Sequence, residues 1–264
     1  MSTTAPPCRS FTTRRSEKIR VIVAQRCRVS TVAEIVRSRR ERLRAQALED
    51  IKTIAMRLLA EGGPDAISLR AIAREMGMTA GAIYGYYATR DELISTLISD
   101  VYTALVDRLE AARDAVAVHD PAGRIVAWAE AVRGWAVERP AEFRLIYGDP
   151  VPGYRPPPGG PATAAELRAC TGLVGLAAAA WPRAAATQTT GDCVWSDFDA
   201  SLAEHVRADF PDLPPDALAL ALRMWGRMHG LIALEVYGHL RPQTPDPAKL
   251  FRAELRDLVR SLGF

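Results

Sequence analysis

Side chains that can bind a phosphate or a base edge gather between residues 68 and 90, in the run SLRAIAREMGMTAGAIYGYYATR. Their hydroxyl and guanidinium groups can donate hydrogen bonds to the oxygens of a polyanion. These groups stand at Ser68, Arg70, Thr79, Tyr84, Tyr86 and Arg90. Gly81 in the same run has no side chain, so it would let a ligand approach the backbone closely. This stretch is therefore the first candidate for a binding site.

Residue types that support catalysis or metal binding occur in the chain, but not at useful spacings. The four histidines, at 119, 205, 229 and 239, lack metal-ligand spacing, and neither a nucleophile elbow nor a phosphate-binding glycine loop occurs. The four cysteines, at 8, 27, 170 and 193, have no metal-like or paired spacing, and we expect them to be reduced. The sequence therefore predicts a protein that is not an enzyme, with no catalytic residue, metal site or cofactor.

The candidate stretch has the pattern of two short helices joined by a glycine turn. Apolar residues recur at i, i+3, i+4 and i+7 over residues 68–76, which is one face of a helix. Gly77 follows where a left-handed residue would end that helix. Thr79 is a good N-cap for a second helix over residues 79–87, on which Ile83 and Tyr87 share a face. This arrangement is typical of a helix-turn-helix, whose second helix can enter the DNA major groove.

Two further helices flank this unit. A first helix is predicted from about Arg39 to Gly62, with an apolar face that should pack on the other two. Downstream, Thr89 and Glu92 have the spacing of a capping box, so a long helix is predicted over residues 90–116. Because that helix continues from the helix-turn-helix into the rest of the chain, it would link the two parts mechanically.

The run AIAREMGMTAGAIYGYYATRDEL, preceded by a helix that ends in LLAEGG, resembles the DNA-binding domain of the TetR-type bacterial transcriptional regulators. The resemblance covers about residues 42–97, and many independent positions agree. It implies an all-α chain with an N-terminal three-helix helix-turn-helix DNA-binding domain at residues 39–97. A C-terminal helical domain for ligand binding and dimerisation would follow at residues 98–264.

The resemblance also implies roles for single residues. Tyr84 occupies the position of the family's phosphate-binding tyrosine, and Arg90 stands where the family usually has a lysine that contacts phosphate. Thr79 can cap its helix and touch phosphate with the same hydroxyl. Arg70 and Arg74, four residues apart on the preceding helix, can supply further phosphate contacts. The predicted DNA-binding residues are Ser68, Arg70, Thr79, Ala80, Gly81, Tyr84, Tyr86 and Arg90.

The second helix departs from the family pattern because it contains no Arg or Lys. Ala80 and Gly85 occupy positions where the family often has a polar or basic side chain. Base readout would then rest on Thr79, on Tyr86 and on contact of Ala80 with a thymine methyl group. Specificity would therefore also depend on DNA shape and on the spacing of two copies of the unit.

Positive charge is concentrated at the N-terminal end of the sequence. Residues 1–44 contain 12 Lys and Arg against 3 Asp and Glu, whereas residues 45–264 contain 22 against 28. The net charge of the chain is only +3. A basic segment that leads into the DNA-binding unit suits a polyanionic partner.

Residues 1–38 are rich in Arg, Ser and Thr and show no clear cap or long apolar period. Three interpretations are open: a flexible basic arm that reaches phosphates or a minor groove, an organelle transit peptide, and an incidental tail from an over-long start. The bacterial resemblance argues against the transit peptide. We expect a basic, disordered extension with at most non-specific contact to DNA.

The C-terminal part predicts helices separated by prolines and glycines, and no β-hairpin signal occurs. The expected helices span residues 121–138, 140–148, 163–181, 194–206, 215–240 and 246–262. The helix over 215–240 has two apolar faces and so needs two burial partners, of which one would be a second copy of the chain. We therefore predict a homodimer through the last two long helices, as the family resemblance implies. The run MWGRMHGLIALE also resembles a Trp-x-x-x-His-Gly pattern of one TetR subgroup.

Large apolar side chains of this part could line a pocket for a small-molecule effector, or could simply fill the core. The predicted lining is Trp128, Trp135, Phe143, Tyr147, Trp181, Met224, Met228 and His229. His229 could hydrogen-bond a ligand or be a satisfied core histidine. The resemblance implies that an effector in this domain changes the spacing of the two DNA-binding units.

The sequence thus predicts a ligand-responsive DNA-binding transcriptional regulator of double-stranded, palindromic operators. A repressor released by a small, largely apolar molecule is the primary hypothesis. A transcriptional activator and a ligand-independent DNA-binding protein are the alternatives. Since no uncharged apolar run of 18 residues and no secretory signal occurs, we expect a cytoplasmic protein without a membrane partner.

Overall fold

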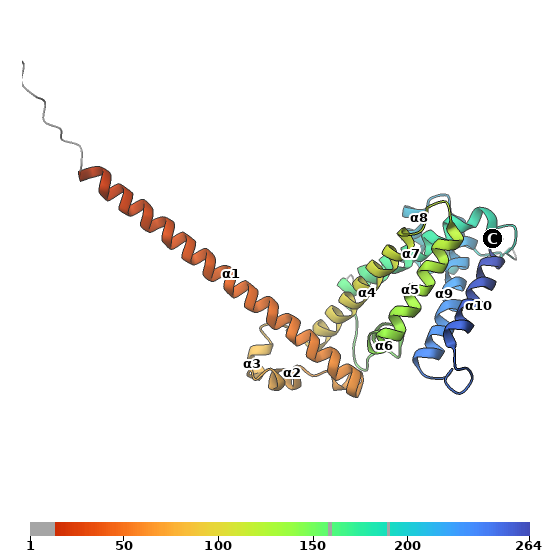
Figure 1. Cartoon of the computed structure of the whole chain (residues 1–264), viewed down its shortest axis with the longest axis horizontal. Helices are drawn as coiled ribbons and strands as arrows, with labels where there is room; N and C mark the ends of the chain where they lie inside the picture. The colour runs from red at the N-terminus through yellow and green to blue at the C-terminus, as the bar shows by residue number, and fades with distance from the viewer. Residues whose placement is uncertain (1–13, 158–159, 189–190) are drawn as a thin grey trace, which may run out of the picture. The chain divides into compact units, whose positions relative to one another are not determined.

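The computed structural model describes residues 14–157, 160–188 and 191–264, and these residues form helices and loops without a β-strand (Figure 1). The α-helices of the described residues are α1 (Arg14–Gly62), α2 (Leu69–Glu75), α3 (Ala80–Ile83), α4 (Arg90–Asp114), α5 (Pro121–Glu138), α6 (Pro140–Tyr147), α7 (Pro161–Ala184), α8 (Ala200–Asp209), α9 (Pro215–Val236) and α10 (Pro247–Ser261). Two 3₁₀ helices, Pro64–Ala66 and Trp195–Asp197, lie in the loops. The prediction of an all-α chain with an N-terminal helix-turn-helix is confirmed.

Helix α1 begins much earlier in the chain than the sequence pattern suggested. We expected residues 1–38 to form a disordered extension and the first helix to begin near Arg39, but α1 begins at Arg14. The physical reason is that no proline or glycine occurs between Arg14 and Glu61, so nothing in this segment interrupts helical hydrogen bonding. The part of the expected extension at residues 1–13 lies outside the described residues.

The chain divides into two compact units, Met1–Thr53 and Ile54–Phe264. The second unit contains the last turns of α1, the helix-turn-helix and the whole C-terminal bundle. On the last turns of α1, Ala55 and Leu59 are buried. Arg57 on the same turns forms an ion pair with Glu75 of α2, which ties α1 to the helix-turn-helix.

Helix α4 connects the helix-turn-helix to the bundle, as predicted (Figure 1). It begins at Arg90 because the Thr89 hydroxyl accepts a hydrogen bond from the Glu92 amide at 3.0 Å. The Glu92 carboxylate accepts from the Ala88 amide at 2.7 Å, one residue before the position expected of a capping box. The first bond satisfies an amide that the helix leaves unpaired, and the second fixes the residue before the cap, so the start of α4 is firmly defined.

The C-terminal bundle is built around α4, α5, α7 and α9. Helix α4 packs along α5 and α7, α7 packs on α9, and α9 also contacts α5 and α10. Large side chains fill the centre, and Trp128, Trp135 and Phe143 are each at most 2% exposed. Burial of such side chains contributes roughly 1.5–3 kcal/mol each to folding, so this core is the main source of the domain's stability.

Three helix boundaries differ from the prediction for local reasons. The helix expected over residues 194–206 begins only at Ala200, because the Asp199 carboxylate accepts hydrogen bonds from the amides of residues 201 and 202. The helix expected over 215–240 ends at Val236, because Gly238 has a left-handed φ of 82°. The helix expected over 79–87 ends at Ile83, where Gly85 follows and weakens any continuation. No helix among the described residues is long and apolar enough to cross a membrane.

Candidate DNA-binding surface and bundle cavities

The turn between α2 and α3 is set by Gly77. Its φ is 66°, so the predicted left-handed residue is present. The Gly77 amide donates to the Arg74 carbonyl at 3.2 Å, and the Met78 amide donates to the Ala73 carbonyl at 2.9 Å. These two bonds are the pattern of a Schellman motif, which satisfies the last carbonyls of α2 and reverses the chain. The chain then enters α3 after only two residues.

Thr79 caps the start of α3, and the exposed residues of its first turn have small side chains or none. The Thr79 hydroxyl accepts a hydrogen bond from the Ala82 amide at 3.2 Å, as an N-cap should. Thr79, Ala80 and Gly81 are all exposed, whereas Ile83 is fully buried. The first turn of α3 therefore offers its backbone and one hydroxyl to a ligand, as expected for a recognition helix.

The three tyrosines after α3 take different positions. Tyr87 is 5% exposed and packs in the core together with Ile83, as predicted. Tyr84 is 47% exposed, and Tyr86 is partly buried. Only Tyr84 thus projects its ring far into solvent, where a hydroxyl can reach a phosphate without any rearrangement of the core.

Helix α2 adds a basic edge to this surface. Arg70 and Arg74 are both exposed, one helical turn apart. Ser68 is the N-cap of α2, but its side chain makes no capping hydrogen bond. Its hydroxyl is therefore not committed to the helix end and is compatible with the predicted contact to DNA.

Arg90 is held by the protein itself. Its Nε donates to the Ile67 carbonyl at 2.9 Å, and its Nη1 donates to the Pro152 carbonyl at 3.2 Å. These bonds connect the segment before α2 with the loop that follows α6. Charged donors form the stronger class of hydrogen bond, so Arg90 is a structural bridge in addition to any contact with phosphate.

The loop over residues 149–157 makes further contacts at the start of α4. The Tyr154 and Ser95 hydroxyls lie 2.9 Å apart and share a hydrogen bond. Ser95 is a polar residue buried to 3% exposure, and the loop residue Val151 is also buried. This proline-rich segment is a loop that is anchored on the first turns of α4.

A cavity of about 130 Å³ lies between α4, α5, α7 and α9 and reaches the surface at Leu222, which is 44% exposed, and we call it the aromatic cavity. It is lined by Tyr102, Leu109, Trp128, Tyr147, Glu166, Ala169, Cys170, Leu173, Leu222 and Trp225. The rings of Tyr102 and Tyr147 pack edge to face with centroids 5.8 Å apart. Burial raises the pKa of both phenols and of the Cys170 thiol, so all three groups are neutral at neutral pH.

The structure brings two of the eight predicted pocket residues, Trp128 and Tyr147, to the aromatic cavity. Trp135, Phe143, Met224 and Met228 are at most 1% exposed and fill the core. Trp181 lies half-buried near the end of α7. The prediction omitted Tyr102 and Trp225, which also line the cavity. Each is an aromatic residue next to the apolar face of a predicted helix, and this pattern could have indicated them.

His229 belongs to an aromatic cluster next to the cavity. Its ring stacks on Phe143 with centroids 5.5 Å apart and contacts Trp225 at 4.8 Å and Tyr147 at 5.3 Å. Burial lowers the pKa of the imidazole, so the ring is neutral. The buried His229 Nδ1 and Trp135 Nε1 atoms have no hydrogen-bond partner among the described residues. His229 therefore packs as part of the aromatic cluster, and its Nδ1 atom has no hydrogen-bond partner among the described residues.

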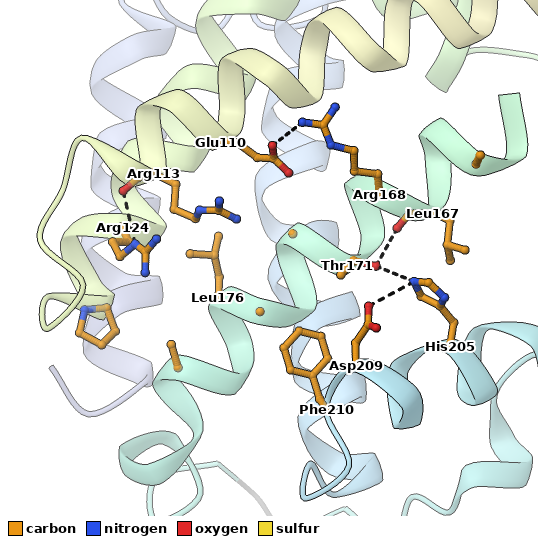
Figure 2. A pocket seen from close by; sticks show the side chains of 15 residues that line it. Glu110, Arg113, Arg124, Leu167, Arg168, Thr171, Leu176, His205, Asp209 and Phe210 are labelled. Atoms are coloured by element: carbon orange, nitrogen blue, oxygen red, sulfur yellow. Dashed lines mark hydrogen bonds and ion pairs between the residues drawn. The ribbon is translucent and has the colours of Figure 1, made fainter. Parts of the chain in front are cut away.

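A larger cleft of about 580 Å³ lies between α4, α5, α7 and α8, and we call it the α7–α8 cleft (Figure 2). None of the eight predicted pocket residues lines it. Its wall on α7 includes Gly172, whose added Cβ would lie 2.4 Å from the Trp128 ring. That ring also lines the aromatic cavity, so the two cavities share the backbone of α7 as a wall.

The fold and the exposed surface of α2 and α3 define a helix-turn-helix DNA-binding protein with a separate helical domain. Comparison with protein families agrees with this class. Residues 53–97 match the bacterial regulatory proteins of the tetR family, and residues 125–258 match the tetracyclin repressor-like C-terminal domain. The chain belongs to the TetR family of DNA-binding transcriptional regulators.

Similar proteins cover most of the chain. The HTH-type transcriptional regulators Rv1816 of Mycobacterium tuberculosis strain H37Rv and Mb1846 of Mycobacterium bovis are each 37% identical over 249 residues, covering 91% of this chain and 99% of theirs. The crystal structure of regulatory protein SCO4313 is 39% identical with a TM-score of 0.67, covering 83% of this chain and 97% of that one. PfmR, a TetR family regulator from Thermus thermophilus, shares the fold with a TM-score of 0.50 at 17% identity, covering 81% of this chain and 97% of that one.

Proposed function

We propose that the protein is a ligand-responsive repressor, which a small, largely apolar molecule releases from its operator. The observation that carries this proposal is the short connection between the aromatic cavity and the DNA-binding unit. Tyr147 lines the cavity and is the last residue of α6. A few residues further on, Pro152 and Tyr154 bond to Arg90 and Ser95 at the start of α4. A molecule in the cavity would therefore act directly on the segment that anchors α4.

The size and lining of the cavity suit a small aromatic or aliphatic molecule. An apolar cavity of about 150 Å³ is known to accept benzene in another protein, which is close to the volume found here. Ring faces and edges of Tyr102, Tyr147 and Trp225 are available for packing with such a molecule. To act as an inducer, the molecule must bind more tightly to the conformation whose two DNA-binding units do not match the spacing of the operator half-sites. Equal affinity for both conformations would leave their equilibrium unchanged.

The DNA-binding surface in this proposal is the exposed edge formed by α2, α3 and Tyr84. Thr79 and Tyr84 contact phosphate, Ala80 and Gly81 approach the bases, and Arg70 adds charge. Support comes from the exposure of all five residues. Ser68 and the partly buried Tyr86 lie at the borders of this edge. Arg90 has its bridging role, and its positive charge would also attract phosphate.

The outer side of α9 is the proposed centre of the homodimer. Leu222, Gly226, Gly230 and Leu234 are exposed and recur every four residues, which forms one ridge along the helix. A Cβ added at either glycine would meet no atom within 4 Å, so a partner helix could approach closely there. Helix α10 presents mostly charged residues outward, and it would form the polar rim of the interface.

A promoter fusion tests the repressor hypothesis against the two alternatives. The DNA upstream of the protein's own gene drives a reporter, in cells with and without the protein. Repression predicts higher reporter output without the protein, whereas activation predicts lower output. Toluene should raise the output in cells with the protein, and the cavity-filling variant Cys170→Phe should remain repressed at the same toluene concentration. A reporter that ignores toluene while the purified protein binds it would support a ligand-independent DNA-binding protein.

A further inference from the structure

The α7–α8 cleft has a cationic end, an apolar middle and a polar end. In Figure 2 the side chains of Arg113 and Arg124 lie on one side, those of His205 and Asp209 lie on the other, and Phe210 lies between them. The volume of about 580 Å³ is within the range of small-molecule sites, which is roughly 300–1,000 Å³. It is several times larger than the aromatic cavity, so the two spaces suit ligands of different size.

The cationic end is held in place by an internal ion-pair network. Arg113 donates from Nε and Nη2 to the Asp114 carboxylate, and Arg124 donates from Nη2 to the same group at 2.7 Å. The Nε of Arg124 donates to the Arg113 carbonyl at 3.3 Å. Both guanidinium groups are only about one-fifth exposed, with side-chain values of 22% and 18%. One carboxylate thus serves two arginines, which leaves a net positive charge and, among the described residues, both Nη1 groups without an acceptor.

The start of α5 does not contribute to binding an anion at this end. Pro121 is the first residue of α5 and lines the cleft beside Arg124, but it has no N–H group. The Asp120 carboxylate already caps this helix end by accepting from the Gly123 amide at 2.8 Å, so the two arginines alone supply the positive charge.

The middle of the cleft is apolar. Leu167, Leu176 and Phe210 supply its apolar side chains. A Cβ added at Gly175 would point at the Phe210 ring, 3.6 Å from its nearest atom, so a larger side chain there would occupy the cleft. The missing side chain at Gly175 therefore creates room for an apolar body beside α7.

The other charged groups of the cleft are paired within the protein. Arg168 forms ion pairs with both Asp107 and Glu110, so this cluster keeps one net negative charge and the anion-binding end is confined to Arg113 and Arg124. At the polar end, the Thr171 hydroxyl donates to the Leu167 carbonyl at 3.0 Å and therefore accepts from His205 Nε2, also at 3.0 Å. Asp209 lies 3.4 Å from the same nitrogen, at the end of the cleft away from Arg113.

We propose that the α7–α8 cleft is a second binding site, for an amphipathic organic acid with an unbranched apolar body of about eight to ten carbons. The carboxylate lies between Arg113 and Arg124, and the apolar chain runs past Leu176 toward Phe210. A water molecule occupies about 30 Å³ in the liquid, so the cleft has room for on the order of twenty groups the size of a water molecule. This exceeds the number of non-hydrogen atoms in the proposed ligand. The site is separate from the aromatic cavity, and its occupancy does not depend on whether that cavity controls DNA binding.

Titration calorimetry of the purified full chain with octanoate and with 1-octanol tests this proposal. Octanoate should bind at least tenfold more tightly than 1-octanol, because only the acid forms charge-assisted bonds with the arginines. Arg113→Gln should weaken octanoate about tenfold and leave 1-octanol within twofold. Gly175→Leu should weaken both compounds, because it fills the apolar middle. Arg183→Gln, on α7 but outside the cleft, serves as the matched control for Arg113→Gln and should change neither affinity.

Circular dichroism melts of each variant distinguish loss of the site from loss of the fold. If Arg113→Gln does not fold, the Gly175→Leu variant still decides the question. The proposal is overturned if octanoate does not bind to the native chain, if 1-octanol binds equally well, or if folded Arg113→Gln and Gly175→Leu bind octanoate with native affinity.

Discussion

The helix-turn-helix and the C-terminal bundle use tyrosine in opposite ways. Tyr84 stands at the surface with 47% of its area exposed. Tyr102 and Tyr147 line a cavity, where burial raises the pKa of their phenols. The surface tyrosine suits a strongly charged, hydrated partner, whereas the cavity tyrosines suit an apolar one. In the proposed function, this difference in burial separates a surface for DNA from a cavity for a small molecule.

Hydrogen bonds join the two regions at the start of α4. Arg90 and Ser95 on α4 receive the loop that begins just after Tyr147. Long-range coupling requires an element that both sites bias, and in the proposed function α4 with this loop has that role. The following changes test the contrast between the surface and the cavity, from the largest expected effect to the smallest.

Disruption of the dimer should have the largest effect on DNA binding. Gly230→Glu places a charge at the centre of the α9 ridge, which would have to be buried without a partner in the dimer. We expect a monomer and a loss of operator affinity of about a hundredfold or more, because two linked half-site contacts become one. Analytical ultracentrifugation and fluorescence anisotropy with operator DNA measure these quantities. Val118→Glu, at a position 77% exposed, is the control and should remain dimeric.

Loss of the left-handed turn should destabilise the surface region. Gly77→Ala forces a side chain into a backbone with φ of 66°, although nothing lies within 4 Å of the added Cβ. The free energy of unfolding should fall by about 1–2 kcal/mol for this reason alone. Gly175→Ala, in the middle of α7, should instead be neutral or stabilise by about 0.5–1 kcal/mol. Urea denaturation compares the two, and equal effects would contradict the strained-turn account.

Removal of a single surface hydroxyl should weaken DNA binding uniformly. Tyr84→Phe deletes the hydrogen bond to phosphate, so affinity should fall about five- to tenfold for operator and non-operator DNA alike. Tyr237→Phe is the matched change at another exposed tyrosine, 42% exposed on the bundle. Native affinity of Tyr84→Phe in a gel-shift titration would remove Tyr84 from the DNA-binding surface.

The smallest expected effect is a pH dependence that comes from the bundle. The pKa of His229 is lowered by burial below its ordinary value of 6.5. The unfolded chain therefore binds a proton more readily, so this residue's stability contribution is present above pH 6.5 and is lost as the pH falls below it. His229→Gln should flatten the decline in melting temperature between about pH 7 and pH 5.5. An unchanged pH profile would show that the ring is not the titrating group.

The elements whose geometry depends on neighbouring residues could be predicted from the sequence. Gly77, Thr79 and Thr89 act through backbone bonds within a few residues, so their types alone indicated the turn and both helix starts. The burial of Tyr87 followed from its spacing to Ile83. The short length of α3 did not, because the cost of Gly85 competes with the apolar period that would extend the helix.

The bundle was predictable as a set of helices but not as a set of cavities. Whether an aromatic side chain such as Trp135 fills the core or lines a space depends on which helices face it, which no local period specifies. The bridge from Arg90 to Pro152 joins residues 62 positions apart, so only the fold brings the two together. The early start of α1 was missed because a segment without an apolar period can still be helical when nothing interrupts it.

The central claim is that occupancy of the aromatic cavity weakens binding at the DNA surface. Fluorescence anisotropy of labelled operator DNA, with and without saturating toluene, measures this most directly. The account predicts that toluene weakens DNA binding by the native protein at least fivefold, since allosteric coupling is typically about 1–3 kcal/mol, and leaves Cys170→Phe unchanged. If calorimetry shows toluene bound to the native protein but the affinity for DNA stays the same, the cavity and the DNA surface are not coupled through this ligand, and the claim is contradicted.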